Sequence, residues 1–561
     1  MKIPFYTCLS PRTLISCLSA CGFALLLASP SMAQVEAPEK PDAKPAAKPA
    51  ATTSADEGSP MARARATITA KLLEGHGTTL ASDAFEGRLT GTAGQQKAAE
   101  YFRTHFEKFG LQPWGDSKQG KRGWEQLYEV QHSGLVADKT GIFGPDGKKL
   151  CEHGAWFVDA RKKQEVKRQG RLFWCGTTNP RELALDGMIA VCLIKESERA
   201  PTSTMAAMGE GFRLMGEIRT LAKNAQAGGA RACIVVAPEL SVSFLSAANM
   251  QTSYPGKPVV TRGRERNMFE GLPPKVPTIV VDGKDAAAVL ALLEIDANAT
   301  WSDEALVGKK SKGQVKIQAK PYSEKVDASN IIGVMEGRDP QQKDEVVVFS
   351  CHMDHLGLTA NGGVFNGADD NASGCSTVLA IAEAFSKLEG DARPRRSVMF
   401  LAVSGEELGL WGSAHFADHP TWPIEKIVAN INMDMLGRST DKVPSDAVAL
   451  TPTFKNNDYS TLALRAAQLG ADFGLRMTNG DKFYQRSDHW NFAKEGIPVV
   501  FFCDDEHADY HMPSDTADKL EFEKIERIAR LAFTIGHEVA SDDRRPKRLG
   551  KQDDWFTEGG R

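Results

Sequence analysis

The sequence predicts an α/β fold, and three observations indicate it. Four apolar runs typical of strands buried on both faces lie at 346–349, 398–403, 427–435 and 499–502. One helical pattern follows the first run, and another, at 522–539, follows the last. Polar residues stand at the ends of these runs, where open α/β sheets place their ligand sites. We therefore expect the chemistry of this chain at the strand ends.

Length and composition indicate a soluble protein with more than one folded unit. The chain has 561 residues, more than one ordinary domain, with 42% hydrophobic and 25% charged residues. Without Lys2 and Arg12, which belong to a leader described next, 66 basic and 72 acidic residues remain. This near-balance, without basic clusters, argues against nucleic acid as a partner. The seven cysteines beyond the leader are odd in number and scattered, so they predict no disulfide framework.

Residues 1–33 have the pattern of a secretory signal. Lys2 and Arg12 precede an apolar segment, 14–28, and small residues follow at a cleavage site. We expect a secreted or periplasmic protein, with a lipoprotein anchored at Cys21 as the alternative. No other segment is apolar and long enough to span a bilayer, so no integral membrane segment is expected after the signal is removed.

Residues 34–60 are rich in Ala, Pro and Lys, a composition that cannot bury a core, and they are predicted to form a disordered linker. Folded protein is expected from about 61. Two helical patterns between 67 and 111 flank the polar motif 82–92 and are interpreted as a helical layer that packs on the sheet. The second pattern carries a core-facing stripe of Ala98, Ala99, Phe102, Phe106 and Phe109.

Residues 131–320 differ in character from the rest. Short β-like runs at 188–194, 232–237 and 277–281 surround one helical pattern at 212–225. None of these runs carries a cluster of His, Asp and Glu with the spacing of a metal site. We therefore expect an inserted β-rich α/β domain without chemistry of its own.

The segment 346–374 joins a buried strand to possible metal ligands. The strand ends at His352 and Asp354, and the motif GADDNASG at 367–374 follows. Imidazole and carboxylate groups both bind zinc. In a His-x-Asp pattern, Asp354 can hold the second ring nitrogen of His352 and so fix the orientation of the ring. The combination predicts a site for a divalent metal ion.

Three further strand ends carry acids or histidines. The second run ends before Glu406 and Glu407, of which one can hold a metal ion while the other faces the water as a general base. The third run contains Asp434, a carboxylate that is costly to bury unless it is paired or bound to metal. His507 and His511 follow the fourth run, and their spacing alone does not choose between them.

Together the strand ends offer five nitrogen and oxygen ligands, too many for one tetrahedral zinc ion. They suit two zinc ions about 3.5–4 Å apart, bridged by one carboxylate and sharing a water. No thiolate is included, as expected for a hydrolytic site rather than a closed structural one.

The ordered set of motifs resembles the secreted di-zinc aminopeptidases, whose wider family also includes glutamate carboxypeptidases. The matching pieces are GRLTGTAG, HMDH, GADDNASG, SGEELGLWGS, NMDMLG, RSDHWNF and YHMPSDT, and they cover about 80–130 and 320–545. The resemblance implies the zinc-exopeptidase fold, which is a mixed central sheet sandwiched by helices. It also implies that the insertion is similar to a protease-associated domain.

The resemblance implies a role for each site residue. Two Zn²⁺ ions per chain are expected, with Asp370 as the bridge and with His352 and Glu407 on different ions. The implied zinc ligands are His352, Asp370, Glu407, Asp434 and His511. The other implied roles are general base for Glu406, orienter of His352 for Asp354, and donor to the developing oxyanion for Tyr510 or Tyr484. Family members also carry a cis peptide bond after the bridging Asp, here Asp370-Asn371.

The predicted function is that of a metallo-exopeptidase, foremost an aminopeptidase that acts on peptides with a free N-terminus. A carboxypeptidase or dipeptidase would keep all five ligands and add Arg or Lys groups, for which Arg486 is a candidate. A receptor-like scaffold would have lost ligands, and a glutaminyl-cyclase-like transferase would use one zinc ion. Nothing in the sequence indicates an oligomeric state. The predicted segments are a signal peptide (1–33), a linker (34–60), a peptidase domain (61–130 and 321–545), an inserted domain (131–320) and a disordered tail (546–561).

Overall fold

The computed structural model describes residues 58–151, 154–158, 164–194, 204–237, 255–262, 275–296, 300–359 and 362–555. The predicted signal peptide and nearly all of the predicted linker lie outside these residues. The first described helix is α1 (Pro60–Ala66), and the Ser59 hydroxyl at its N-terminus accepts a hydrogen bond from the Ala62 N–H.

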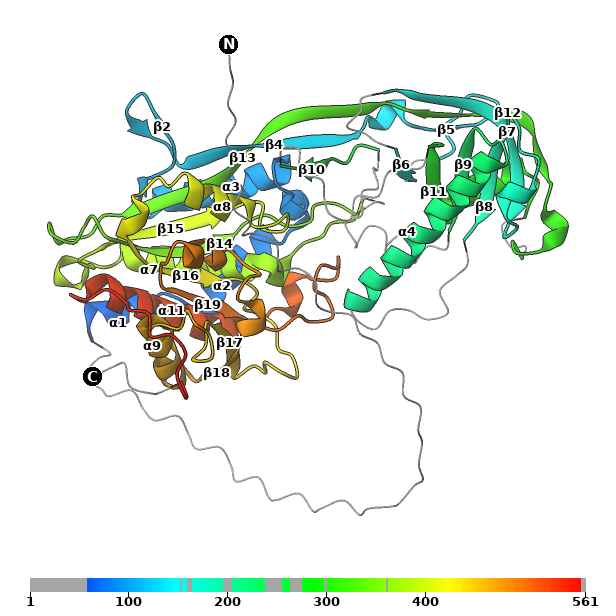
Figure 1. Ribbon diagram of the computed structural model, residues 1–561. Helices are drawn as coiled ribbons and strands as arrows, with labels where there is room; N and C mark the ends of the chain where they lie inside the picture. The colour runs from blue at the N-terminus through cyan, green and yellow to red at the C-terminus, as the bar shows by residue number, and fades with distance from the viewer. Residues whose placement is uncertain are drawn as a thin grey trace, which may run out of the picture. The chain divides into compact units, whose positions relative to one another are not determined.

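The larger of two main sheets has ten strands of mixed direction (Figure 1). Its order is β10-β4-β13-β15-β14-β16-β19-β17-β18, and β1 pairs with β13. Strands β15, β14, β16 and β19 run parallel to one another, whereas β13 and β17 join this group antiparallel. The bounds are β1 Gln112–Pro113, β4 Glu125–Leu135, β10 Val259–Thr261, β13 Pro321–Met335, β14 Val346–His352, β15 Ser397–Val403, β16 Ile427–Met433, β17 Ala447–Thr451, β18 Arg476–Asn479 and β19 Val499–Cys503.

Helices cover both faces of this sheet, so the predicted α/β class with a mixed, helix-sandwiched sheet is confirmed. The first face packs against α1 and against α2 (Ala70–Leu80), α3 (Ala93–Lys108), α7 (Gly374–Ser386), α9 (Thr461–Leu469) and α11 (Phe522–Ser541). The opposite face packs against α8 (Trp411–Asp418) and α10 (His489–Lys494).

The central strand β14 shows why the apolar runs are continuous. Every residue of Val346–His352 is buried. Val347 and Phe349 pack into the core with α7 and α11, whereas Val346 and Val348 pack into the opposite core with α8 and α10. Helix α11 lies close to this strand because Gly536 has no side chain, and a Cβ there would stand 2.1 Å from the Phe349 ring. A strand covered on both faces has no polar side, which explains the sequence pattern.

A second, seven-stranded sheet is formed by residues between β4 and β13. Its order is β5-β12-β7-β8-β9-β11-β6, and it packs with α4 (Thr204–Ala227) and α6 (Gly283–Leu292). The three predicted β-like runs correspond to β8, β9 and β11, and the predicted helix corresponds to α4. The borders of the inserted domain, and its likeness to a protease-associated domain, stay predictions. The bounds are β5 Gly141–Phe143, β6 Ala155–Phe157, β7 Val166–Gly176, β8 Ile189–Leu193, β9 Ala232–Val236, β11 Thr278–Val281 and β12 Lys310–Ala319.

The end of the chain differs from the prediction. A disordered tail is expected from 546, and this is wrong for residues 546–555. The Leu549 N–H donates to the Tyr459 carbonyl oxygen over 2.7 Å, and the Tyr459 hydroxyl donates to the Trp555 carbonyl oxygen over 2.8 Å. The Trp555 ring packs edge-on against Phe454. Contacts of this kind hold a segment whose charged composition suggests disorder; residues 556–561 lie outside the described part.

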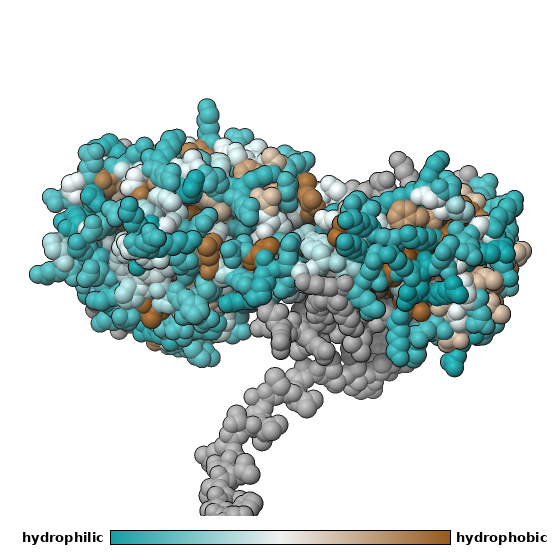
Figure 2. Space-filling model, turned by 90° about the horizontal axis from the view of Figure 1, so that it is seen from above, coloured by the Kyte–Doolittle hydropathy of each residue, from teal (hydrophilic) through white to brown (hydrophobic). Residues whose placement is uncertain are grey.

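The face shown in Figure 2 is largely hydrophilic, with apolar residues in small groups. Among the described helices, none combines the length and the apolar character needed to cross a membrane. All seven cysteines beyond the predicted signal are buried. Cys351 and Cys375 belong to the core under the first face of the large sheet, in agreement with a packing role.

Candidate metal centre

Four neighbouring strands bring the candidate residues to one edge of the large sheet. Strand β14 ends at His352, and the segments after β15, β16 and β19 carry the Glu406-Glu407 pair, Asp434 and His511. Because these strands are parallel, their carboxyl ends lie at the same edge. The turn Ala368–Ser373, which leads into α7, adds Asp370.

His352, Asp370 and Asp434 form a first group. The distance from His352 Nε2 to Asp434 Oδ1 is 3.1 Å, and the distance to Asp370 Oδ1 is 3.3 Å. All three side chains are buried, and one ligand atom from each lies within 4.8 Å of the other two. This spacing is short enough for a single ion to contact all three atoms.

Asp370, Glu407 and His511 form a second group. His511 Nε2 lies 3.1 Å from Asp370 Oδ2 and 2.9 Å from Glu407 Oε2. Asp370 is therefore shared, because its Oδ1 faces His352 and its Oδ2 faces His511. A carboxylate whose two oxygens face two sets of ligands has the geometry of a bridge between two metal ions.

Asp369, the residue before Asp370, and His507, the alternative to His511, lie outside both groups and pair with each other. His507 Nε2 is 3.2 Å from Asp369 Oδ2, and Asp369 Oδ1 accepts a 2.7 Å hydrogen bond from the Gly437 N–H. The structure thus brings Asp370 and His511 into the groups, and neither Asp369 nor His507.

Sequence reasoning missed His355. Its side chain is fully buried, and its Nδ1 lies 2.5 Å from Glu407 Oε1 and 3.9 Å from Asp370 Oδ2. One ligand atom each from His355, Asp370 and Glu407 lies within 4.8 Å of the other two. The available signal was the second His of the HMDH motif, three residues after His352.

The turn that carries Asp370 is fixed by side chains from distant segments. The Asp515 carboxylate accepts hydrogen bonds from the backbone N–H groups of Asp369 and Asp370 over 3.0–3.2 Å. The Asn371 amide donates to the Met433 carbonyl oxygen at the end of β16 over 3.0 Å. Gly374 is required here, because a Cβ would lie 2.3 Å from the Asn371 side chain. The Asp370–Asn371 peptide bond is cis, as the family resemblance implies.

The adjacent carboxyl groups of Glu406 and Glu407 have opposite electrostatic environments. Burial raises the pKa of Glu406 well above its usual value, and the charges of Asp434 and Glu407 raise it further although His352 lowers it. Burial and the nearby charge of Asp370 also raise the pKa of Glu407. The imidazoles of His511 and His355 outweigh both effects and lower this pKa to about 2. Glu406 is therefore suited to holding a proton and Glu407 to carrying a charge.

Asp370 and His352 each favour their charged form, a negative carboxylate beside a positive imidazole. Burial opposes the ionisation of Asp370, but the imidazoles of His352 and His511 outweigh it and hold its pKa well below the usual value. For His352, burial favours the neutral ring, but Asp434 and Glu406 outweigh it and raise its pKa well above the usual value. Buried acids around buried imidazoles form a centre that attracts cations.

Asp354 lies beside His352 and Glu406. His352 Nδ1 is 3.2 Å from the carbonyl oxygen of Asp354 and 3.7 Å from its Oδ1, so the nearer acceptor is the backbone. The Asp354 carboxylate accepts hydrogen bonds from Thr90 and from the Glu406 N–H.

The expectation that Tyr484 could donate to the oxyanion is wrong. Its hydroxyl donates to Asp458 over 2.5 Å, and its ring packs in the core under the opposite face of the sheet. Tyr510 remains beside the groups, stacked on the His511 ring.

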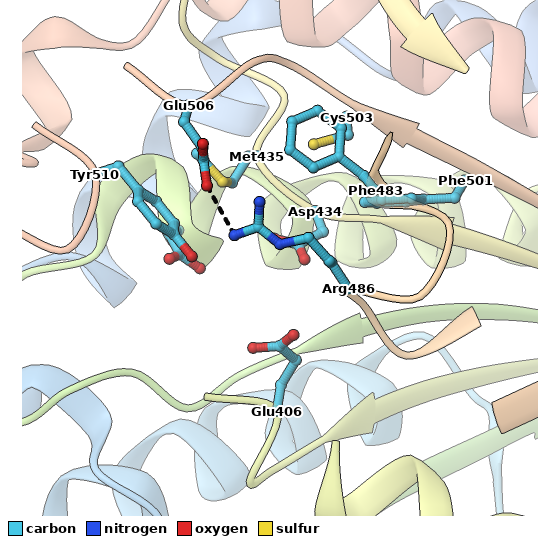
Figure 3. Close-up of a pocket in the computed structure, with 10 residues that line it drawn as sticks. Glu406, Asp434, Met435, Phe483, Arg486, Phe501, Cys503, Glu506 and Tyr510 are labelled. Atoms are coloured by element: carbon cyan, nitrogen blue, oxygen red, sulfur yellow. Dashed lines mark ion pairs between the residues drawn. The ribbon is translucent and has the colours of Figure 1, made fainter. Parts of the chain in front are cut away.

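A pocket of about 350 Å³, counting the space open to solvent, adjoins both groups. Glu406 lies across it from Arg486 and Tyr510 (Figure 3). Arg486 forms a 2.7 Å ion pair with Glu506 and lies over the Phe483 ring. The apolar lining consists of Met435, Phe483, Phe501 and Cys503.

The donor atoms fit zinc. Ligand atoms at about 2.1 Å from one tetrahedral zinc ion are roughly 3.4 Å apart, and the distances within the two groups, from 2.9 to 3.3 Å, are close to this. The donors are imidazole nitrogens and carboxylate oxygens, which zinc binds well. They converge in a buried centre without a thiolate, as in a hydrolytic site.

Comparison with known proteins agrees with this site. Residues 330–535 match the model of Peptidase family M28. The aminopeptidase YwaD of Bacillus subtilis (strain 168) is 28% identical over 44% of this chain and 53% of its own length. A probable leucine aminopeptidase of Arthroderma benhamiae is 27% identical over 36% of this chain and 56% of its own length.

The matched segments are partial. The chain spans about half the length of these curated relatives, 53% and 56%. Among solved structures, that of BSAP, a zinc aminopeptidase from Bacillus subtilis, is similar with a TM-score of 0.48 and 18% identity, over 85% of this chain and 96% of that one.

Proposed function

We propose that the protein is a zinc-dependent exopeptidase that removes N-terminal residues from peptides, and the match of residues 330–535 to the model of Peptidase family M28 supports this. One observation carries this proposal: the oxygens of Asp370 face two separate groups of ligands. A single-zinc site needs no such sharing, so the arrangement supports two zinc ions per chain.

The residues around the groups support a hydrolytic mechanism. Two zinc ions held there would acidify a shared water and polarise the peptide carbonyl. Glu406, with Oε2 at 4.0 Å from His352 Nε2 and with its raised pKa, is the group that takes the proton of the water and returns it to the leaving amine. Tyr510, which lines the same pocket, donates its hydroxyl proton in a hydrogen bond to the developing oxyanion.

The pocket supports an N-terminal residue as the group that is bound. Its acidic side, with Asp370, Glu406 and Asp434, favours a free α-ammonium group. Its wall of Met435 and Phe501 favours an apolar side chain on the residue that is released. The partners that we propose are therefore peptides with a free N-terminus.

One observation favours a second candidate, a carboxypeptidase or dipeptidase. The Arg486 side chain lines the pocket and is 47% exposed, and Glu506 is its one carboxylate partner among the described residues. A guanidinium group can bind two carboxylates through its separate N–H pairs. Arg486 is thus placed to bind a C-terminal carboxylate of a short substrate.

A panel of peptides tests both candidates. We expect release of the N-terminal residue from free-amine peptides, loss of this activity with chelator, recovery with Zn²⁺, and no turnover of N-acetylated peptides. Preference for Leu-Gly over Leu-Gly-amide that disappears in Arg486→Met would favour the dipeptidase. Release of C-terminal residues from N-acetylated peptides would favour the carboxypeptidase.

Two other outcomes of the panel would overturn the proposal. Cyclisation of N-terminal Gln without hydrolysis would indicate a glutaminyl-cyclase-like transferase. Two bound zinc ions without turnover of any peptide would indicate a receptor-like scaffold.

We also propose that the protein acts outside the cytoplasm, because residues 1–33 have the pattern of a secretory signal. N-terminal sequencing of the protein from the extracytoplasmic fraction of expressing cells tests this. A mature start close to residue 34 is expected, and an N-terminal lipid at Cys21 would instead indicate the anchored form.

A further inference from the structure

We propose that His355 is a positioning residue that holds Glu407 by one oxygen and so directs its other oxygen to the second group. This inference rests on the proposed function, since it assumes that Glu407 is a zinc ligand. It assigns a task to a residue that lies outside the five expected ligands.

The contact involves two buried side chains. His355 is fully buried, and the Glu407 side chain is 3% exposed. His355 Nδ1 lies 2.5 Å from Glu407 Oε1, whereas Glu407 Oε2 lies 2.9 Å from His511 Nε2. The two oxygens of Glu407 thus have separate partners on opposite sides of the carboxylate.

The proton in this contact belongs to the imidazole. A carboxylate that binds zinc is ionised, so Glu407 only accepts hydrogen bonds. Nδ1 of His355 must therefore donate. A ring nitrogen that carries a proton has no lone pair for a metal ion, so Nδ1 serves Glu407 instead of acting as a ligand.

The first group has the same arrangement. Asp434 Oδ1 faces His352 Nε2, and Asp434 Oδ2 accepts a 2.8 Å hydrogen bond from the Ser487 hydroxyl. Asp434 and Glu407 each therefore direct one carboxylate oxygen to a histidine of their own ligand group, and the other oxygen accepts a hydrogen bond from a donor outside that group. Asp370 differs, because both of its oxygens face groups.

The ring of His355 is held by its surroundings. Gly367 has a positive φ of 55°, and a Cβ there would lie 2.5 Å from His355 Cγ and Cδ2. The ring also meets the His511 ring edge-on, at 5.9 Å between centroids. Close packing on both sides restricts the rotamers of His355, which a residue that orients a ligand requires.

Zinc binding to the apo-protein tests the proposal without using activity. Calorimetric titration and metal analysis are expected to show two zinc ions on the wild type. In His355→Ala, one of the two sites should weaken by about 10–100-fold, the usual effect of removing a partner that orients a ligand. In His355→Asn most of the affinity should return, because the Asn amide N–H₂ is the same number of covalent bonds from Cα as Nδ1 of His and can donate in its place.

His537 provides the matched control. Its ring makes one hydrogen bond, between Nε2 and the Ala392 carbonyl oxygen, and it lies on α11 away from the two groups. His537→Ala should leave both zinc affinities unchanged. Thermal melting of all the apo-proteins reports folding separately from metal binding.

Two results would overturn the role of His355 while leaving the proposed function intact. One is His355→Ala with two zinc affinities equal to the wild type. The other is His355→Asn as defective as His355→Ala, which would mean that the ring itself is the ligand. A wild type that binds fewer than two zinc ions would instead overturn the proposed function, and the task of His355 with it.

Discussion

At the scale of single residues, Glu406 and Glu407 are neighbours with different chemistry. The pKa of Glu406 is raised and that of Glu407 is lowered, because only Glu407 lies against His355 and His511. We predict that Glu406→Gln lowers kcat by about 10²–10⁴-fold, the usual contribution of a general base. The zinc content should not change, since Glu406 is not a ligand. Steady-state kinetics with metal analysis measures both.

Glu336 is a suitable control for that substitution. It is a half-exposed acid that pairs with Lys343 on the surface, so Glu336→Gln should leave kcat unchanged. A fall of less than tenfold in Glu406→Gln, with both zinc ions retained, would show that another group takes the proton.

The sequence predicted residues that stand at strand ends, and it missed His355, a residue of the HMDH motif whose part in the site depends on a contact through space. His352 ends a strand, and the other four predicted ligands follow a strand or precede a helix; strand ends are visible as the ends of apolar runs. His355 lies in a loop, and its contact with Glu407 joins segments 52 residues apart. Tyr484 looked equivalent to Tyr510 in the sequence, but its hydroxyl faces Asp458.

At the scale of elements, the strands that were predicted from the sequence have both faces buried, and strands with one exposed face were missed. Strands β14, β15, β16 and β19 are buried along their whole length, so their sequences are continuous apolar runs. In the second sheet, the long strand β12 largely alternates buried and exposed residues, and the first half of the long strand β7 is mostly exposed; both carry several charges, and no strand was predicted there. A half-exposed strand gives a weak signal because only every second residue is apolar.

Arg88 joins three elements around the site. It is 1% exposed and donates to backbone carbonyl oxygens in three places: at the end of α2, just after β14, and in the loop that precedes the Asp370 turn. The acceptors are Leu80, Met353, Asn366 and Gly367, at 2.6–3.0 Å. Arg88→Lys keeps the charge but cannot reach all four acceptors, and each buried carbonyl left without a partner costs about 1–3 kcal/mol. We predict a loss of about 2–4 kcal/mol in the free energy of unfolding, measured with denaturant.

Arg103 is the matched control on α3. It is 43% exposed and pairs with Glu100 and Glu107 on the helix surface. Arg103→Lys should change the free energy of unfolding by less than about 0.5 kcal/mol. Equal stability of Arg88→Lys and the wild type would mean that the four contacts to Arg88 do not hold the motif segments.

At the scale of the whole molecule, the two main sheets have separate cores. The large sheet packs its apolar residues with α7 and α11 on one face and with α8 and α10 on the other. The second sheet packs its own residues with α4 and α6. Both groups of candidate zinc ligands belong to segments of the large sheet, so metal binding should stabilise that unit alone.

Calorimetry with and without chelator tests this separation. A ligand at about 1,000 times its Kd stabilises the folded state by about 4 kcal/mol per site, and about 1 kcal/mol raises the Tm of a domain of this size by roughly 2–4 °C. We therefore predict two thermal transitions in the zinc-loaded protein and a fall of at least about 10 °C in one of them when zinc is removed. The other transition, from the second sheet, should stay within about 1 °C, a margin far below the shift expected from either site. Asp370→Asn should abolish the zinc-dependent shift, because both groups lose the carboxylate that they share. If both transitions moved together with zinc, the two cores would unfold as one cooperative unit.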